Sequence, residues 1–242
     1  MLSNVLSPGN RIEIQEMERS ITASPDAPKK IYNSTIYDVI SDDTLEIAMP
    51  MEQTKLILLP VDKEYDLVFY TQSGLFQCFA RITDRYKSNN IYLLKVEFTS
   101  NLRKHQRREY YRFACALELS ARDLEKEELV AAEAKQPYML QPGLPVVKSV
   151  IVDISGGGLR FLSVHQYEAG SLIYCGFWLS REGRRREYEV VGRVLAVREL
   201  PNRKGTYEHR VQFYDINSAS REEIIRFIFE EERKSRKKDR TN

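Results

Sequence analysis

Basic residues cluster in three short segments, 103–112, 184–186 and 233–240, and the chemistry of the first suits the binding of an anion. Residues 103–112 read RKHQRREYYR and carry five formal positive charges against one glutamate. A guanidinium group stays charged, presents a planar fork of donors to phosphate, and matches the O6 and N7 acceptors of guanine. Arg107, Arg108 and Arg112 form an RRxxxR pattern and are therefore candidates for holding phosphates and a purine.

A second short motif, DISGGG at residues 153–158, ends a strand-like segment. The Asp153 carboxylate can accept hydrogen bonds from N1–H and N2–H₂ of guanine, a pair of donors that adenine lacks. Ser155 adds a small hydroxyl, and Gly158 allows the backbone to turn tightly and to approach a ligand closely. These three residues form a DxSxxG pattern and are candidates for reading a guanine base.

Each motif has a simpler explanation when it stands alone. A cluster of arginines between domains is usually a solvated linker, and Asp, Ser and Gly are the usual residues of a hairpin turn. In this chain the arginine motif enters a series of strand-like segments, and the DxSxxG motif follows the second segment of that series. This order favours one shared binding site for a ligand that combines phosphate with guanine.

Short segments that alternate in polarity make up most of the chain, and turn residues separate them. They are rich in β-branched and aromatic residues, as strands are. Strands at this spacing, with few helices between them, predict antiparallel barrels or sandwiches. The expected strands are residues 11–15, 35–40, 44–49, 55–59, 65–72, 76–82, 92–98, 113–119, 146–154, 159–164, 171–179, 188–197 and 209–214.

One helix is expected near the C-terminus. Ser220 and Glu223 have the spacing of a capping box, in which the serine accepts from the first turn and the glutamate reaches back. Ile224, Ile225 and Ile228 then line one face, with Phe227 beside them. We predict a helix that starts at Ser220, covers an open end or edge of the second β series, and frays into solvent after Phe229.

The composition is that of a globular protein. The chain has 242 residues, of which 42% are hydrophobic and 30% charged, with a net charge of +2, and this length suits two β domains. No segment approaches the length that spans a bilayer, and the N-terminus does not resemble a secretory signal, so we expect a cytoplasmic protein. Cys78, Cys115 and Cys175 lie far apart within apolar patterns, which predicts buried thiols and no metal site.

The segment from about Arg107 to Lys234 resembles a PilZ domain, a family of six-stranded barrels that bind cyclic di-GMP. The resemblance rests on the RRxxxR and DxSxxG motifs and on HRVQFYDINSASREEIIRFIFEEERK at residues 209–234, which is similar to the last strand and closing helix of the family. Residues 10–100, which include YNSTIYDVISDDTLEIAMP, resemble the N-terminal split barrel of YcgR-type flagellar brake proteins. The resemblance thus covers nearly the whole chain.

This resemblance implies a mainly β fold of two antiparallel β-barrel domains with a C-terminal helix. The expected parts are an N-terminal YcgR-like split barrel at 1–102, an arginine-rich linker at 103–113, and a six-stranded PilZ barrel with its closing helix at 114–242. Residues 121–145 depart from the family pattern because they are longer than a hairpin requires. Their Glu-, Ala- and Leu-rich half is expected to form a short helix, and their proline-rich half a loop.

In the family, the arginine segment wraps over the ligand while the aspartate and the serine read a guanine from the barrel surface. Arg107 occupies the place of a second arginine that accompanies an intercalated pair of ligands, so a pair is expected. Arg160 follows the glycine run and is left outside the predicted site. The predicted cyclic di-GMP-binding residues are Arg107, Arg108, Arg112, Asp153, Ser155 and Gly158; no catalytic or metal-binding residue is predicted.

The resemblance implies a receptor that changes its interdomain arrangement when it binds cyclic di-GMP. Without ligand, the repelling charges and small apolar area of residues 103–112 predict a mobile hinge. The ligand phosphates would neutralise this charge and pin the segment against the second barrel. By resemblance to the flagellar brakes, the ligand-bound form would dock on the stator or rotor of the flagellar motor and slow swimming.

Three other functions are open to a chain of this kind. Small β barrels bind nucleic acid through basic grooves and stacked aromatics, and Tyr110, Tyr111 and Phe113 alternate with arginines here; the low net charge disfavours this function. An enzyme is disfavoured because GxxxxGK[ST], HExxH and GxSxG motifs are missing and the three histidines are scattered. A PilZ domain that only scaffolds is disfavoured because every motif residue is present.

Overall fold

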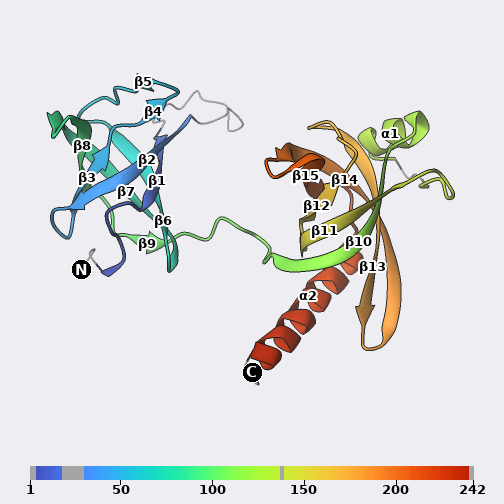
Figure 1. Cartoon of the computed structure of the whole chain (residues 1–242). Coiled ribbons are helices and arrows are strands. Elements are labelled where there is room, and N and C mark those ends of the chain that lie inside the picture. The colour runs from blue at the N-terminus through green and yellow to red at the C-terminus, as the bar shows by residue number, and fades with distance from the viewer. Residues whose placement is uncertain (1–3, 18–29, 137–138, 240–242) are drawn as a thin grey trace. The chain divides into compact units, whose positions relative to one another are not determined.

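The computed structural model describes residues 4–17, 30–136 and 139–239. The chain divides into two compact units, with the boundary between Arg107 and Arg108 (Figure 1). Within the described residues, no helix has the length and apolar character that crossing a membrane requires. Each unit is built on antiparallel strands and has its own apolar core.

The first unit is a curled antiparallel sheet. Its strands follow the order β6-β1-β2-β3-β8-β7-β9, and β6 also pairs with β7, so the sheet folds back on itself. Strands β4 and β5 pair with each other in a separate two-stranded sheet. They lie between β3 and β6 in the sequence. The strands are β1 (Arg11–Glu16), β2 (Ile31–Val39), β3 (Thr44–Ala48), β4 (Met51–Glu52), β5 (Lys55–Leu56), β6 (Glu64–Thr71), β7 (Gly74–Ser88), β8 (Ile91–Phe98) and β9 (Arg103–Lys104).

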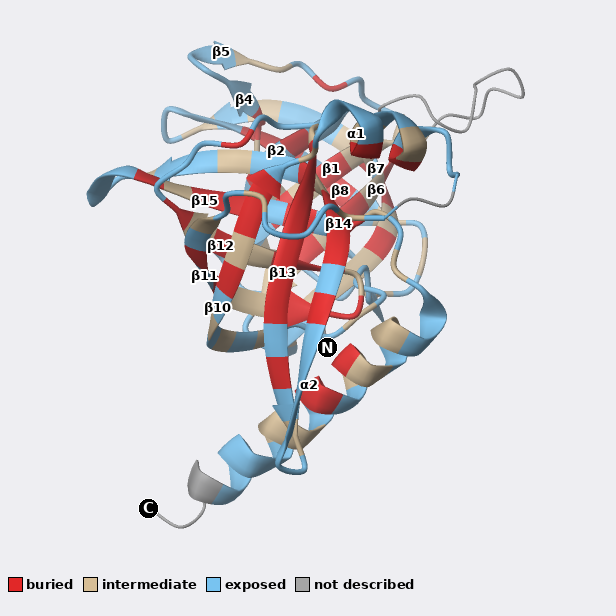
Figure 2. Ribbon diagram, turned by 90° about the vertical axis from the view of Figure 1, so that its right-hand side faces the viewer, coloured by how far each residue is buried: buried red, intermediate tan, exposed pale blue. Residues whose placement is uncertain are grey.

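Alternation along each strand separates the core of the first unit from solvent. Ile12 and Ile14 of β1, and Leu67 and Phe69 of β6, are at most 1% exposed. Successive side chains on a strand point to opposite faces, so Glu13 and Val68, which lie between these positions, face the other side and are partly exposed. The period of two that the sequence shows in 11–15 and 65–72 is therefore the period of burial in the structure (Figure 2).

The second unit contains a closed six-stranded antiparallel barrel. The strand order is β10-β11-β12-β15-β14-β13, and pairing of β10 with β13 closes the ring. Closure gives every strand two neighbours and leaves no unpaired edge for aggregation. The strands are β10 (Phe113–Asp123), β11 (Val147–Ser155), β12 (Gly158–Ser163), β13 (Leu172–Arg181), β14 (Arg184–Leu200) and β15 (Arg203–Phe213).

The strand predictions correspond to observed strands, with one clear exception. Residues 55–59 were predicted as a strand, but only Lys55–Leu56 is one. Leu58 is 64% exposed, and the Leu59 N–H donates to the carbonyl of Ile57, which forms a tight turn and not a ladder. Pro60 follows and has no N–H to give to a partner strand. This part of the prediction is therefore wrong.

The helix α2 (Ser218–Asp239) packs on the second barrel as predicted, but its start was placed wrongly. Its first turns bring Ile224, Phe227 and Ile228 into the barrel core (Figure 2). The side chain of Asn217 accepts the N–H of Ser220 at 2.8 Å, so the asparagine caps the helix and Ser220 lies inside it. Asn217, three residues before Ser220, accepts one of the unpaired N–H groups of the first helical turn, so the helix begins before the serine.

The predicted fraying after Phe229 is also wrong. The helix continues to Asp239. Pairs one turn apart, Lys234 with Glu231 and Arg236 with Glu232, each have a nitrogen–oxygen distance of 2.5 Å. Each such pair stabilises an exposed helix by about 0.2–0.5 kcal/mol.

The 121–145 insertion contains the predicted short helix, α1 (Lys126–Glu133), and a buried ion pair fastens it. Arg122 donates from Nη1 and Nη2 to the two carboxylate oxygens of Glu128, at 2.7 Å each, and the side chains are 7% and 2% exposed. Glu128 also accepts the backbone N–H groups of Glu125 and Gln141. The hydrogen bond from Arg122 is the main reason why the pKa of Glu128 falls to about 2.

The cysteines are free thiols, as the sequence predicts. Cys78 and Cys175 are buried and Cys115 is half-buried. Burial raises the pKa of Cys78 and of Cys175 to about 12 and that of Cys115 to about 11. Thiols with such pKa values are inert packing groups near neutral pH.

Candidate ligand-binding site

The DISGGG motif forms the tight turn between β11 and β12. Ser155 faces Gly158 at the end of the ladder, and Gly156 and Gly157 make the turn itself. The Ser155 hydroxyl donates to the Gly158 carbonyl at 3.0 Å and lies 3.4 Å from the Gly157 N–H. Ser155 is buried and therefore braces the turn from within.

Gly158 is required by the packing of the barrel. A Cβ atom at this position would lie 2.1 Å from the carbonyl oxygen of Val211 on the neighbouring strand β15. Because that oxygen belongs to the backbone, no side-chain movement could relieve the clash. The motif glycine thus has a structural reason that is independent of any ligand.

Asp153 lies on β11 two residues before Ser155 and belongs to a chain of alternating charges. Its Oδ2 accepts a hydrogen bond from Nε of Arg160 at 2.6 Å, and Nη1 of Arg160 donates to Oε2 of Glu208 at 2.6 Å. Arg198 pairs with the other oxygen of Glu208 at 3.3 Å. Asp153 and Glu208 are only 18% and 6% exposed, so both carboxylates are held in fixed orientations. These hydrogen bonds, that to Asp153 first, raise the pKa of Arg160.

Sequence reasoning left Arg160 outside the site, although a signal for it was present. Asp153 and Arg160 stand at equal distances from the Gly156–Gly157 turn, and in a hairpin with a two-residue turn such positions face each other. Opposite charges facing across a ladder attract. The register alone therefore pairs Arg160 with the motif aspartate.

Tyr110, in the middle of the arginine motif, packs directly on this turn. A Cβ atom would approach the tyrosine ring to 2.6 Å if placed on Gly156 and to 2.9 Å if placed on Gly157. The Tyr110 hydroxyl accepts a hydrogen bond from Nη1 of Arg221 at 2.8 Å, and the Arg221 guanidinium carbon lies 5.5 Å from the ring centroid. The structure thus brings the RRxxxR segment and the DxSxxG turn together.

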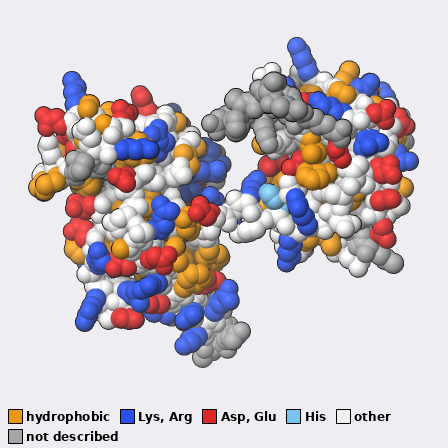
Figure 3. All heavy atoms as spheres, turned by 180° about the vertical axis from the view of Figure 1, so that it is seen from behind, with side chains coloured by type: hydrophobic (Ala, Val, Ile, Leu, Met, Phe, Trp, Pro, Cys, Tyr) orange, Lys and Arg blue, Asp and Glu red, His pale blue; other side chains and the backbone are white. Residues whose placement is uncertain are grey.

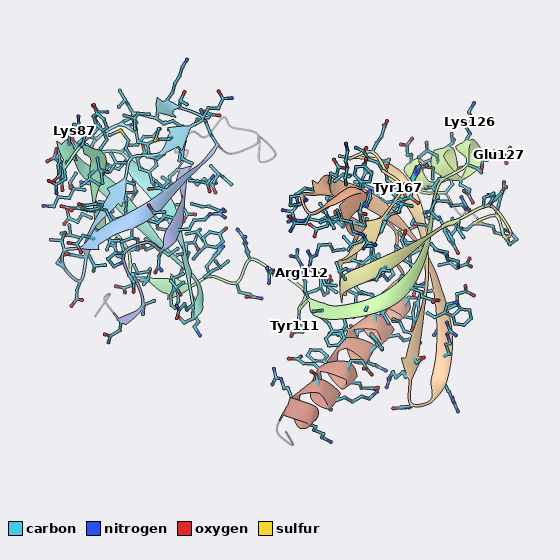
Figure 4. All side chains as sticks on the ribbon, in the orientation of Figure 1. Lys87, Tyr111, Arg112, Lys126, Glu127 and Tyr167 are labelled. Carbon is cyan, nitrogen blue, oxygen red and sulfur yellow. The ribbon has the colours of Figure 1, made fainter. Side chains whose placement is uncertain are left out.

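Arg108 and Arg112 flank Tyr110, and both side chains are exposed. Arg112 lies just before β10, where Figure 4 shows it beside Tyr111. The next residues, Phe113 and Ala114, pair with Ile154 and Asp153 of β11. Arg112 is therefore held next to the strand that carries the motif aspartate and serine.

Arg107 makes its contacts within the first unit. Its Nη1 pairs with Oε2 of Glu13 at 3.2 Å, and its guanidinium lies 5.2 Å from the ring centroid of Tyr70. Arg11 approaches the same ring to 4.5 Å and pairs with Oε1 of Glu13 at 2.7 Å. The Tyr70 hydroxyl donates to Glu13, and burial followed by this hydrogen bond raises the pKa of Tyr70.

The basic segment also begins with fixed contacts. Lys104 pairs with Phe76 in the β7–β9 ladder, and the N–H of His105 donates to the carbonyl of Leu75 at 2.8 Å. With Tyr110 docked at the other end, the hinge motion expected from the sequence concerns the residues between these contacts. That motion stays a prediction.

The charge on the molecular surface is mixed. On the face shown in Figure 3, Lys and Arg side chains alternate with Asp and Glu among the side chains drawn for both units. A barrel that tracks a nucleic acid backbone presents a continuous basic groove. This face does not have that pattern, in keeping with a net charge of +2 for the chain.

Two family models match the chain. The model described as PilZ domain matches residues 106–230, and the model described as flagellar protein YcgR matches residues 7–98. A comparison with curated proteins gives no match. The two matched regions correspond to the second and the first structural unit.

The chain is similar to solved structures of other proteins. The Bacillus subtilis inhibitor of motility, MotI/DgrA, is 16% identical, with 96% of this chain and 100% of that chain covered and a TM-score of 0.73. The complex of Escherichia coli YcgR with c-di-GMP is 14% identical, with 97% and 89% covered and a TM-score of 0.46. The PilZ model alone spans just over half of the 242 residues, so this chain belongs to the PilZ domain family, with a YcgR-type N-terminal domain before its PilZ barrel.

Proposed function

We propose that this protein is a cytoplasmic receptor for cyclic di-GMP and not an enzyme. The proposed site comprises Arg108 and Arg112 on the arginine segment and Asp153, Ser155 and Gly158 at the β11–β12 turn. The observation that carries the proposal is the docking of Tyr110 on this turn, because it places a cationic segment beside an oriented carboxylate. A ligand with two phosphates and two guanines matches that combination of charges.

Asp153 can read a guanine while Arg160 stays in place. An ionised carboxylate has about four lone-pair sites for hydrogen bonds, and Arg160 uses one of them on Oδ2. Guanine N1–H and N2–H₂ can take two of the others. An ionised carboxylate can accept hydrogen bonds from both of these donors.

The proposed stoichiometry is an intercalated pair of ligands, with Arg107 as the additional cation. Arg107 is engaged by Glu13 and Tyr70 of the first unit. It would have to exchange the Glu13 carboxylate for a ligand phosphate. This exchange would connect ligand binding to the N-terminal domain and change the interdomain arrangement, as expected of a two-state receptor.

The proposed output is control of a partner protein, with the stator or rotor of the flagellar motor as the first candidate. This part of the proposal is supported by the YcgR model that matches residues 7–98 and by the likeness in fold to an inhibitor of motility. A ligand can drive such a switch only through its different affinities for the two arrangements, which typically amounts to about 1–3 kcal/mol.

A calorimetric titration of the full chain with cyclic di-GMP tests the proposal. We expect a dissociation constant of about 1 μM or below, worth about 8 kcal/mol, and two ligands per chain. Arg108→Ala should weaken binding about tenfold or more, because charge-assisted hydrogen bonds contribute about 1.5–3 kcal/mol. Arg203→Ala, an exposed arginine at the start of β15, is the matched control.

Excess RNA at moderate salt separates this function from nucleic acid binding. A receptor should keep its affinity for cyclic di-GMP in that competition, whereas a nucleic acid binder should lose it. Absence of heat and of thermal stabilisation with cyclic di-GMP would leave a scaffold as the better explanation and would overturn the proposal.

A further inference from the structure

We propose that Tyr110 is a positioning residue that docks the arginine segment on the glycine turn before any ligand arrives, and that Arg221 of α2 holds it there. The inference rests on the proposed function and deepens it, because it assigns the preorganisation of the ligand site to two residues that neither motif specifies: Tyr110, at a variable position of RRxxxR, and Arg221 of α2.

The glycine turn is shaped as a seat for the tyrosine ring. Neither Gly156 nor Gly157 has a backbone φ in the left-handed region, so the turn conformation does not require glycine at these positions. Glycine is needed at these positions because a larger residue would collide with neighbouring side chains. A Cβ at Gly156 would meet Tyr110 and Ile225, and the three nearest atoms to a Cβ at Gly157 would all belong to the Tyr110 ring.

Arg221 anchors the ring from the opposite element. It stands in the first turns of α2, whose next residues enter the barrel core. The hydrogen bond to the Tyr110 hydroxyl and the approach of the guanidinium to the ring act together on one side chain. Nε of Arg221 is buried and has no hydrogen-bond partner among the described atoms. A buried donor without a partner lowers the stability of the fold, and the contacts of Arg221 with Tyr110 must offset this loss.

Fixing Tyr110 limits where the ligand arginines can go. Arg108 and Arg112 are each two residues away from Tyr110 in the sequence. Ordering a free segment costs conformational entropy for every residue that is fixed, and a segment that is already docked has met part of this cost before the ligand binds. Tyr110 therefore raises the affinity for the ligand without touching it.

The adjacent Tyr111 provides a matched control. It is 53% exposed and lies beside Arg112, as Figure 4 shows. Loss of its ring removes the same number of atoms from the same segment as loss of the Tyr110 ring. The two substitutions therefore differ in the contact with the glycine turn.

Amide hydrogen exchange of the ligand-free full chain tests the docking directly. We expect Tyr110→Ala to speed the exchange of amides 108–112, Tyr110→Phe to have a smaller effect because the ring remains, and Tyr111→Ala to have none. Melting temperatures of the three variants check that the barrel is folded. Unchanged exchange in a folded Tyr110→Ala variant would overturn the proposal.

A double-mutant cycle identifies the partner of the ring. Gly157→Ala should displace the ring and speed the same amides, because the nearest neighbour of its new Cβ would be the Tyr110 ring at 2.9 Å. In the Tyr110→Ala background the same change should have no further effect, since residues in contact are not additive. Equal effects of Gly157→Ala in both backgrounds would show that the glycine does not act through Tyr110.

Titration with cyclic di-GMP then measures the consequence for binding. If Tyr110→Ala lowers the docked population to about one in ten, the apparent Kd rises about tenfold, whereas Tyr111→Ala leaves the Kd unchanged. Wild-type protein that binds the ligand while Tyr110→Ala binds it equally well would overturn the positioning role. Wild-type protein that does not bind would overturn the proposed function, and the exchange experiment would still decide the docking.

Discussion

Arg160 donates from Nε to Oδ2 of Asp153 across 2.6 Å, and the two residues face each other in the β11–β12 ladder. Glu208 of β15 holds the same guanidinium through Nη1 at 2.6 Å and is almost completely buried. The carboxylate that is proposed to read guanine is thus oriented by a cation, and that cation is oriented by a second carboxylate. Three strands of the barrel contribute to this arrangement.

Removal of Arg160 should weaken the reading of guanine. Arg160→Gln leaves Asp153 without its cation and without a fixed orientation. A buried charge-assisted hydrogen bond contributes about 1.5–3 kcal/mol, and Arg160 is partly exposed, so we expect a smaller loss, about threefold to tenfold in the Kd for cyclic di-GMP. Calorimetry with cyclic di-GMP and with cyclic di-AMP measures this.

The preference for cyclic di-GMP over cyclic di-AMP tests whether Asp153 recognises guanine. Asp153→Ala should bring the two dissociation constants closer together, because adenine does not use the carboxylate. Arg198→Gln is the control, since it changes a mostly exposed partner of Glu208 and should leave both constants nearly unchanged. An equal loss for both ligands in Asp153→Ala would contradict the reading role.

Glu13 should compete with the ligand for Arg107. Glu13→Gln removes the negative charge that pairs with Arg107 and should free this arginine for a phosphate. Exposed ion pairs are worth about 0.2–1 kcal/mol, so binding of cyclic di-GMP should tighten by up to about fivefold. The effect should shrink at high salt because screening weakens exposed pairs.

Glu16, on the same strand as Glu13, provides the control. Glu16 pairs with Lys63 at 3.0 Å and takes no part in the Arg107 cluster. Glu16→Gln should leave the Kd for cyclic di-GMP unchanged. Weaker binding by Glu13→Gln would show that Glu13 supports the ligand-bound form instead of competing with it.

His209 should make the stability of the second unit depend on pH. The residue is fully buried, its Nε2 accepts the Tyr167 N–H at 3.1 Å, and its ring stacks on Phe161 at 4.6 Å. Burial lowers its pKa from 6.5 to about 4. Between these values the unfolded chain binds a proton and the folded chain does not, so stability falls as the pH drops from about 6.5 to about 4.

The slope of that loss can be measured by urea unfolding at several pH values. One titrating group changes the free energy of unfolding by at most about 1.4 kcal/mol per pH unit. His209→Gln should flatten the profile in this window. The same slope in wild type and His209→Gln would assign the titration to another group.

The Arg122–Glu128 pair should be essential to the stability of the 121–145 insertion. Glu128→Ala leaves a buried arginine without its partner and should cost about 3–5 kcal/mol of unfolding free energy. Glu127→Ala, on the exposed neighbour that Figure 4 labels, should change stability by less than about 0.5 kcal/mol. Thermal unfolding of both variants compares them, and similar melting temperatures would contradict a structural role for the pair.

The same pair predicts a second pH dependence, at lower pH. The pKa of Glu128 falls from 4.5 to about 2 in the folded chain. A carboxyl group with a depressed pKa stabilises the fold fully above its unfolded value, and this stabilisation is lost as the pH falls from about 4.5 to about 2. Glu128→Ala should lack this loss, which unfolding experiments in that range can show.

Local patterns in the sequence were sufficient for most of the strands and for the two motifs. The alternation in 65–72 becomes the buried and exposed faces of β6, and the glycines of DISGGG become the β11–β12 turn. These features depend on neighbours within a few residues, so a short window contains the information. Even Arg160 opposite Asp153 follows from the register of a two-residue turn.

Contacts between distant residues were decided by the tertiary structure alone. Arg221 meets Tyr110 across 111 positions of sequence, and Arg107 meets Glu13 across 94. Many pairings of arginine with an aromatic or acidic residue are compatible with the same local pattern. Which of them forms depends on the order of strands in each sheet and on where α2 packs. For this reason the sequence indicated which side chains could bind the ligand, whereas the fold determined which residues orient them.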